Sequence, residues 1–487
     1  MTKADKAFKR ADYLKAYSLY QDYLKADSTN YQVVYKSGLC LFNINKTDSL
    51  AYRRFFKIRA QVPEAHFYLG RILQMNENTE KALEEFYTYI LTKNRNKESF
   101  PDSVVKQEIQ KCERAIVERR QRDFFVVRNI GNKINTSFPE YVPLIWTLNG
   151  NLVFTSRRSD SKGGQIDAYG RYYEDIYISA KKDSTLEAPV PLSDSLNSPG
   201  HDACVAFSPD GNELIIYRTD ETKLAGDLYM SRYKNNTWTA PVKLGSEVNS
   251  EYLETSACFS AYGNEIVFSS NRPGGYGGRD LYRVVKFLNG EYSLPVNLGP
   301  EINSQEDEDA PFLDFNNNTL YFSSKGHQTM GEYDIFMAEF DTGKDRWKHP
   351  VNMGQPVNSS NDDIYFVKQK DQAKGYFSSR REGGYGDADL YEVDFSGSTA
   401  MIAYCRILPA DSGKLDPGEI NVSLYDLKTG KLEGSYKPNP ESGNMIILAT
   451  KDHRYQLKVE SGTYQVLTQE VSFNDKNKEL ILYLNKQ

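Results

Sequence analysis

The chain has 487 residues, enough for about three domains of roughly 150 residues each. With 39% hydrophobic and 26% charged residues, it is neither disordered nor a membrane protein as a whole. A net charge of −6 argues against a dedicated nucleic-acid binder, whose binding face is strongly basic. The 35 Tyr, 24 Phe and 33 Gly favour a chain with many short strands and turns.

Membrane spans, disulfides and metal sites are not expected. The sequence has no run of 18 or more apolar residues, and the polar start 1–6 lacks the apolar segment of a secretory signal. The cysteines and histidines are scattered, without CxxC or zinc-ligand spacing. We therefore expect buried thiols and no metal or other cofactor. The five cysteines are Cys40, Cys112, Cys204, Cys258 and Cys405.

Residues 1–122 carry a helical pattern. Small and aromatic residues recur at helical spacing in 4–41 and again in 65–89, whereas 50–59 is irregular. Small residues let two helices approach, and large ones fill the space between them. The pattern resembles tetratricopeptide (TPR) repeats, whose helix pairs of about 34 residues stack into a solenoid with a partner-binding groove. A further helix at about 102–120 is expected to cap the stack. The alternative is a small helical bundle.

Residues 123–396 contain a five-fold repeat. An Asp followed by an aliphatic and an aromatic residue recurs at spacings of 52, 53, 54 and 55 residues. An Asn series runs in parallel, with an acid five residues after each Asn and an apolar residue fourteen after each acid. The repeat Asp residues are Asp175, Asp227, Asp280, Asp334 and Asp389. The repeat acids are Glu140, Asp202, Glu254, Glu308 and Asp363.

Each repeat predicts three or four short strands joined by turns. Four-stranded sheets at this period are typical of propeller blades, so five copies predict a five-bladed β-propeller. The spare strand 125–128 is expected to close the ring against the last blade. The segments 208–211 (SPDG), 269–280 (SSNRPGGYGGRD) and 378–386 (SSRREGGYG) resemble the PD40 repeat of TolB-like and WD40-like propellers.

Repetition decides how the charged residues are interpreted, because a residue needed once in a chemical site would not be copied into every blade. We therefore assign no catalytic residue. The repeat Asp side chains are expected to hold blade loops by accepting backbone and Arg hydrogen bonds. The repeat acids are expected near the start of each innermost strand, at one mouth of the channel, with backbone or Asn partners. A shared cation is the alternative. The Gly-rich loops join strands, so no helix N-terminus is present for a phosphate.

Positions that break the repeat are the candidates for binding. In the first repeat Asp175 follows Phe154 by 21 positions, where the equivalent interval in the other repeats is 11 or 12. This insertion mixes charges with Tyr, a residue type that supplies contact area at low entropic cost. A tolerated surface insertion is the alternative. In 306–309, only Glu308 belongs to the repeat; the flanking acids would attract a basic partner or a cation, or form a solvated loop. The candidate partner-binding residues are Asp160, Lys162, Tyr169, Arg171 and Tyr172.

Residues 397–487 alternate apolar and polar residues in six or seven short segments separated by Gly-containing turns. This pattern predicts a small antiparallel β-sandwich. The segments 411–415, 420–426, 442–444 and 453–459 resemble the carboxypeptidase regulatory-like (transthyretin-like) domain. The lone His453 is expected to be a turn residue.

The order of the three regions resembles Bacteroidota periplasmic proteins of the PorE kind, which are OmpA-family proteins associated with type IX secretion and gliding. The resemblance implies a non-enzymatic, outer-membrane-associated scaffold or adaptor in the periplasm that binds other proteins. That family ends in a peptidoglycan-binding OmpA-like domain, which this sequence lacks, so peptidoglycan is expected as a partner only if such a domain exists. Two alternatives stay open. One is a glycan-associated binding or sensor protein, and the other is a propeller glycosidase, which needs acids unique to single blades in the channel.

Overall fold

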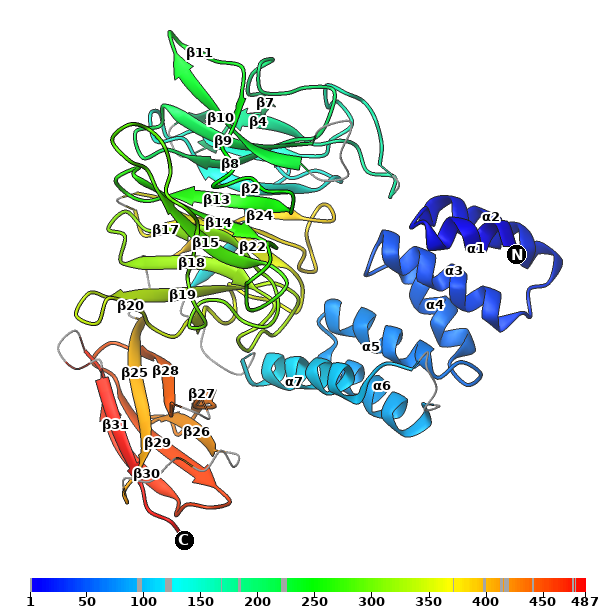
Figure 1. Ribbon diagram of the computed structural model, residues 1–487. Coiled ribbons are helices and arrows are strands. Elements are labelled where there is room, and N and C mark those ends of the chain that lie inside the picture. The colour runs from blue at the N-terminus through cyan, green and yellow to red at the C-terminus, as the bar shows by residue number, and fades with distance from the viewer. Residues whose placement is uncertain are drawn as a thin grey trace.

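The computed structural model describes residues 2–93, 99–118, 125–167, 169–182, 185–219, 226–370, 372–396, 400–411, 415, 420–439, 442–474, 477 and 479–487. Helices form the N-terminal part, five small sheets of mainly antiparallel strands follow, and two further sheets form the C-terminal part (Figure 1). None of the described helices combines the length and the apolar character that a membrane span needs.

The helical part packs small residues against aromatic rings. A Cβ on Gly38 would lie 2.9 Å from the Phe55 ring, and one on Gly70 would lie 2.6 Å from the Phe86 ring. Helix α4 covers most of segment 50–59, where the repeat pattern is irregular, because Asp48 caps its N-terminus and Ala51 and Phe55 are buried. The helices are α1 (Thr2–Lys9), α2 (Tyr13–Ala26), α3 (Tyr31–Ile44), α4 (Ser49–Ile58), α5 (Glu64–Met75), α6 (Thr79–Thr92) and α7 (Asp102–Glu118).

The five repeats form five separate sheets, here called the repeat sheets. The first contains β2 (Glu140–Ile145), β3 (Leu152–Ser156), β4 (Asp175–Ser179) and β7 (Val190–Pro191), and a hairpin, β5 (Lys181–Lys182) and β6 (Thr185–Leu186), follows β4. The second contains β8 (Asp202–Phe207), β9 (Glu213–Thr219), β10 (Gly226–Lys234), β11 (Thr237–Trp238) and β12 (Val242–Lys243).

The remaining repeat sheets follow the same order. The third contains β13 (Glu254–Phe259), β14 (Glu265–Ser270), β15 (Asp280–Val285) and β16 (Val296–Asn297). The fourth contains β17 (Glu308–Leu313), β18 (Thr319–Ser324), β19 (Asp334–Asp341), β20 (Arg346–Trp347) and β21 (Val351–Asn352). The fifth contains β22 (Asp363–Lys368), β23 (Lys374–Ser379) and β24 (Asp389–Asp394), with β1 (Val126–Asn129) at its edge.

The inner strands are the first strands of the five sheets: β2, β8, β13, β17 and β22. Each contacts the next in this order, and β22 contacts β2. The apolar residue fourteen positions after each repeat acid is fully buried in the second strand of its sheet. These residues are Phe154, Ile216, Phe268, Phe322 and Phe377.

Strand β1, which precedes the first repeat, belongs to the sheet of the last repeat. It pairs antiparallel with β24, with Val126 opposite Asp394 and Asn129 opposite Tyr391. The pairing that the sequence predicted for 125–128 is therefore confirmed. It joins two segments that lie more than 250 residues apart in the chain, and so ties the start of the repeats to their end.

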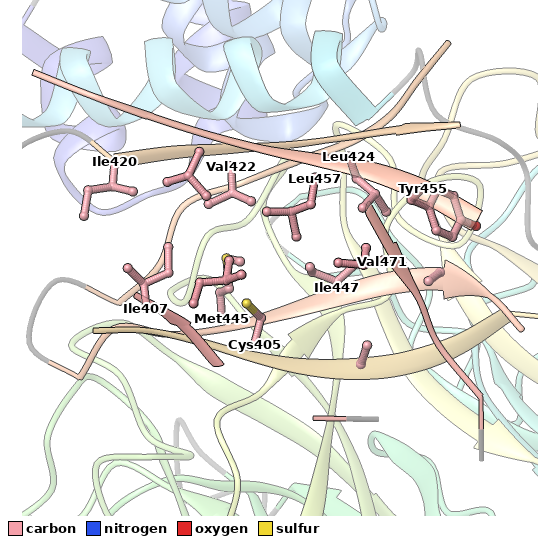
Figure 2. Packing of buried hydrophobic residues seen from close by; sticks show 14 of the residues in the cluster. Cys405, Ile407, Ile420, Val422, Leu424, Met445, Ile447, Tyr455, Leu457 and Val471 are labelled. Atoms are coloured by element: carbon pink, nitrogen blue, oxygen red, sulfur yellow. The ribbon is translucent and has the colours of Figure 1, made fainter. Parts of the chain in front are cut away.

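The C-terminal part is two facing sheets whose inward side chains pack together (Figure 2). Val422 and Leu457 from one sheet lie over Cys405 and Ile447 from the other. The predicted all-antiparallel pairing is wrong at one place, because β31 runs parallel to β25. The strands are β25 (Ala400–Pro409), β26 (Ile420–Asp426), β27 (Leu432–Tyr436), β28 (Asn444–Thr450), β29 (Arg454–Ser461), β30 (Leu467–Ser472) and β31 (Glu479–Leu484).

Candidate functional site

Each repeat acid is the first residue of an inner strand and is fully buried. Glu254 accepts hydrogen bonds from the Ser250 amide (2.9 Å), the Ser250 hydroxyl (2.6 Å) and the Ser270 hydroxyl (2.6 Å), and the Arg272 guanidinium lies 3.2 Å away. Arg partners occur likewise at Glu140, Asp202 and Asp363. We call this arrangement the acid latch, and the end of the inner strands where it lies the acid end.

Two of the hydrogen-bonding patterns expected from the sequence differ from those in the structure. The Arg residues bind the repeat acids rather than the repeat Asp residues, and the Asn residues do not bind the acids. Instead, the Asn249 amide bonds the backbone of Leu228 in the preceding sheet, accepting from its N–H at 2.8 Å and donating to its C=O at 2.9 Å. Equivalent Asn–backbone pairs join the other sheets. The Asn series therefore connects neighbouring sheets.

The repeat Asp residues hold the loops that follow the second strands. Asp280 accepts from the amides of Tyr276 (2.7 Å) and Gly277 (2.9 Å) and from the Asn297 side chain (2.7 Å). Asp334 and Asp389 have the same kinds of partner. Asp175 accepts from the Lys162 amide, and Asp227 pairs with Lys243 instead.

The latch of the fourth repeat lacks a guanidinium. His327 takes the place of the Arg: its Nε2 lies 2.7 Å from the Ile302 carbonyl, the contact that Arg272 makes with Val248, and 4.0 Å from the Glu308 carboxylate. Burial raises the pKa of Glu308 to about 7 and lowers the pKa of His327 to about 4. This is therefore the one described latch in which the carboxylate is not balanced by a permanent cation.

Charged residues that flank the repeated positions gather at the acid end. Arg157 lies 2.8 Å from the buried Glu174 carboxylate, which His201 also contacts. Arg279 lies 2.8 Å from the buried Asp309, which also accepts from the Thr255 hydroxyl at 3.0 Å. Glu174, Arg279 and Asp309 adjoin repeated positions but differ from repeat to repeat, whereas Arg157 has a counterpart in Arg380 of the fifth repeat. Sequence reasoning missed Arg157, Glu174 and Arg279. The signal for Glu174 and Arg279 was their variation beside constant neighbours.

A cavity of about 250 Å³ lies among the inner strands, and all five of them contribute to its wall. The rings of Tyr141 and Tyr365 lie 6.3 Å apart in its lining, and Glu174 reaches it from the acid end. Burial acts to raise the pKa of Glu174, but the His201 hydrogen bond and the Arg157 charge hold it below its usual value. The Glu174 carboxylate is therefore ionised and paired with cations of the chain.

The first-repeat insertion contacts the helices of the same chain. The Tyr169 ring lies 5.9 Å from Tyr13 of α2, and the Arg171 guanidinium donates to the carbonyl of Ile44 in α3 at 3.2 Å. Tyr172 packs against Phe138. The other two candidates also have partners, since Asp160 accepts from Tyr177 and Lys162 lies near Asp194. Each of the five candidate residues therefore also has a contact within the chain, while Ile166 of the same insertion is 56% exposed.

Further contacts join the helices to the acid end. Arg71 of α5 pairs with Glu332, and it also lies 2.5 Å from Glu108 of α7. Arg114 of α7 donates to the Thr329 carbonyl at 2.5 Å, and the Asn361 side chain donates to the Met75 carbonyl. The helical part thus lies against the acid end of the repeat sheets. We call this contact the seam.

The described residues contain no group of three or more His, Cys, Asp or Glu side chains placed to hold a metal ion. All five cysteines are buried and unpaired, as the sequence predicted.

No family model and no curated protein matches the chain. Its structural neighbours include propeller folds. A TolB candidate from Agrobacterium tumefaciens is 15% identical over 53% of this chain and 76% of its own, with a TM-score of 0.31. An α-L-arabinofuranosidase from Lactobacillus brevis is 13% identical over 55% and 92%, with a TM-score of 0.36. A gluconolactonase from Xanthomonas campestris is 12% identical over 58% and 92%, with a TM-score of 0.30. At these values no activity is transferred to this chain.

Proposed function

We propose that this chain is a non-enzymatic scaffold that binds protein partners in a periplasmic, outer-membrane-associated complex of the type IX secretion kind. Its parts are a TPR-like solenoid, a closed five-bladed PD40 propeller and a regulatory-like sandwich. The cyclic contacts of the inner strands and the pairing of β1 with β24 support closure of the propeller. The periplasmic setting follows from the resemblance of the sequence to PorE-type proteins.

The state of the single-repeat acids supports a binding role over glycoside hydrolysis. A general acid needs a raised pKa so that it carries a proton at neutral pH. Glu174 has a lowered pKa beside Arg157 and His201, and Asp309 is paired with Arg279 at 2.8 Å. Both acids are therefore bound to cations of the chain, which favours a structural use of the acid end.

The main support for the proposal is an exposed face of α4 that presents apolar and cationic side chains. Leu50 is 41% exposed and Phe56 is 45% exposed. Leu50 lines a groove of about 260 Å³ between α2, α3 and α4, together with Arg53, Arg54 and Lys57. These three cations form no ion pair with another described residue. Aromatic and Arg side chains are enriched in protein interfaces, so this face suits an acidic partner segment with apolar residues.

Charge reversal on α4 tests the proposal. Arg53→Glu/Lys57→Glu should lower the capture of an identified envelope protein at least tenfold, while Lys6→Glu/Lys9→Glu, a matched reversal on α1, should capture it as wild type does. Both pairs of residues are on helix surfaces, so the melting temperature should stay unchanged. Equal capture by all three proteins would refute docking on α4. Hydrolysis of a glycan by wild type, abolished by Glu174→Gln, would refute the non-enzymatic role.

A further inference from the structure

The inner strands end at a second opening, here called the turn end, which is lined by apolar side chains. A cavity of about 330 Å³ lies there, and its wall includes Trp146, Phe207, Phe259 and Phe312. Tyr262, in one of the turns, is 83% exposed, and Leu148 and Phe315 in two other turns are also exposed. The seam with the helices lies at the acid end, so it does not cover this opening. An exposed apolar surface around a preformed cavity is typical of a binding site.

Five equivalent residues begin the turns at this end. The backbone amide of each donates to the carbonyl five residues later, at 2.8 to 2.9 Å, which shows that the five positions correspond. The residues are Trp146, Ser208, Ser260, Asp314 and Gln369.

Four of these five side chains form a hydrogen bond or an ion pair within the chain. The Trp146 indole donates to the Gly211 carbonyl at 2.9 Å. The hydroxyls of Ser208 and Ser260 accept from the amides five residues later, at 2.9 and 3.1 Å. Asp314 pairs with Lys368 at 2.9 Å.

Gln369 is the exception. It lines the cavity and is 8% exposed, and its buried Oε1 accepts no hydrogen bond from any described residue. A buried acceptor without a donor destabilises the fold, because its lost bond to water is not replaced. At the position where the other four repeats bond their turns internally, the side-chain acceptor of this repeat has no partner among the described residues.

Lys370, the next residue, supplies a cation at the rim of the same cavity. It is exposed, and it forms no ion pair with another described residue. The nearby Lys368, which also lines the cavity, is already paired with Asp314. A carboxylate entering the cavity would therefore meet Lys370.

We propose that the turn end binds a small aromatic acid that carries an N–H or O–H donor. The ring would pack against the Trp146 and Phe259 side of the cavity, the donor would bond Gln369 Oε1, and the carboxylate would pair with Lys370. A volume of about 330 Å³ is at the lower end of the ~300–1,000 Å³ typical of ligand pockets, which suits one or two fused rings. The site is separate from the α4 face and from the acid end.

Three related compounds test this proposal by calorimetric titration of the full chain. Indole-3-acetate has the ring, the N–H donor and the carboxylate, whereas indole-3-acetamide lacks the carboxylate and 1-naphthylacetate lacks the donor. We expect indole-3-acetate to bind with one-to-one stoichiometry and at least tenfold more tightly than either analogue.

Substitutions assign each contact. Lys370→Gln should remove the preference for indole-3-acetate over its amide, and Gln369→Leu should remove the preference over 1-naphthylacetate. Lys234→Gln, an exposed lysine on β10 outside the cavity lining, should leave both preferences intact. The proposal is overturned if indole-3-acetate binds more weakly than about 1 mM, or if the two analogues bind as tightly as it does. It is also overturned if Lys370→Gln and Gln369→Leu leave the preferences of wild type unchanged.

Discussion

Replacing Glu308 with Gln should reduce the dependence of the stability of the repeat sheets on pH. Glu308 is fully buried, and its latch has His327 in place of a guanidinium. Burial raises its pKa from 4.5 to about 7, so the folded chain binds more protons than the unfolded chain between these values. The stability from this group is therefore present near pH 5 and is lost as the pH rises through 7.

The magnitude follows from the size of the pKa change. The rise to about 7 corresponds to about 2–3 kcal/mol of unfolding free energy that is present at pH 5 and absent at pH 8. His327 has the opposite sign, because burial lowers its pKa to about 4 and its neutral form is favoured as the pH rises from 4 to 6.5. His327, Asp334 and Asp175 are present in both wild type and Glu308→Gln. Their titration therefore contributes equally to both proteins, and the difference in pH dependence between the two comes from Glu308.

Urea unfolding followed by tryptophan fluorescence measures this difference, because Trp146, Trp238 and Trp347 all lie in the repeat sheets or their turns. Wild type should lose about 2–3 kcal/mol more than Glu308→Gln between pH 5 and pH 8. The control Glu254→Gln alters a latch that contains Arg272, and its loss of stability should be similar at both pH values. If Glu308→Gln keeps the full pH dependence of wild type, the reasoning from the missing guanidinium is wrong.

Three further predictions concern closure, the latches and the seam. A chain that begins at Phe125 should keep the unfolding midpoint of the repeat sheets, whereas one that begins at Gly131 should have a much lower midpoint because β1 no longer pairs with β24; equal midpoints would argue against closure. Arg272→Ala should cost about 3–5 kcal/mol in urea unfolding, since it leaves the buried Glu254 carboxylate without a cation, and a cost under about 1 kcal/mol would contradict the latch. Arg71→Ala should increase hydrogen–deuterium exchange in α5 and α7, because Arg71 joins both helices to the fourth repeat; unchanged exchange would show that the seam does not depend on it.

The sequence predicted the features that are copied between repeats. The constant interval after each repeat acid places the acid at the start of an inner strand and a buried apolar residue in the next strand, and the structure has both. The spare strand 125–128 was also predictable, because the last repeat lacked an edge strand. Constant spacing determines local register, so these elements could be predicted from the sequence.

Contacts between regions were not predictable from the same pattern. Tyr169 and Arg171 were singled out as candidates for an external partner, but the pattern did not predict their contacts with α2 and α3 of the same chain. Gln369 was not singled out, because its unpaired acceptor is recognised only when the four equivalent turns are compared in three dimensions. The sequence pattern is irregular in α4, because its buried residues pack against α3 and α5 without following the repeat spacing.

Site-specific photo-crosslinking in the cell envelope tests the proposed scaffold role most directly. Benzoylphenylalanine would replace Phe56, which is exposed on α4, and in a second protein it would replace Tyr169, which lies at the seam. The account predicts that the probe at position 56 crosslinks to a separate envelope protein, and that the probe at position 169 crosslinks within the chain, to α2. Partner crosslinks from position 169 with none from position 56 would contradict it.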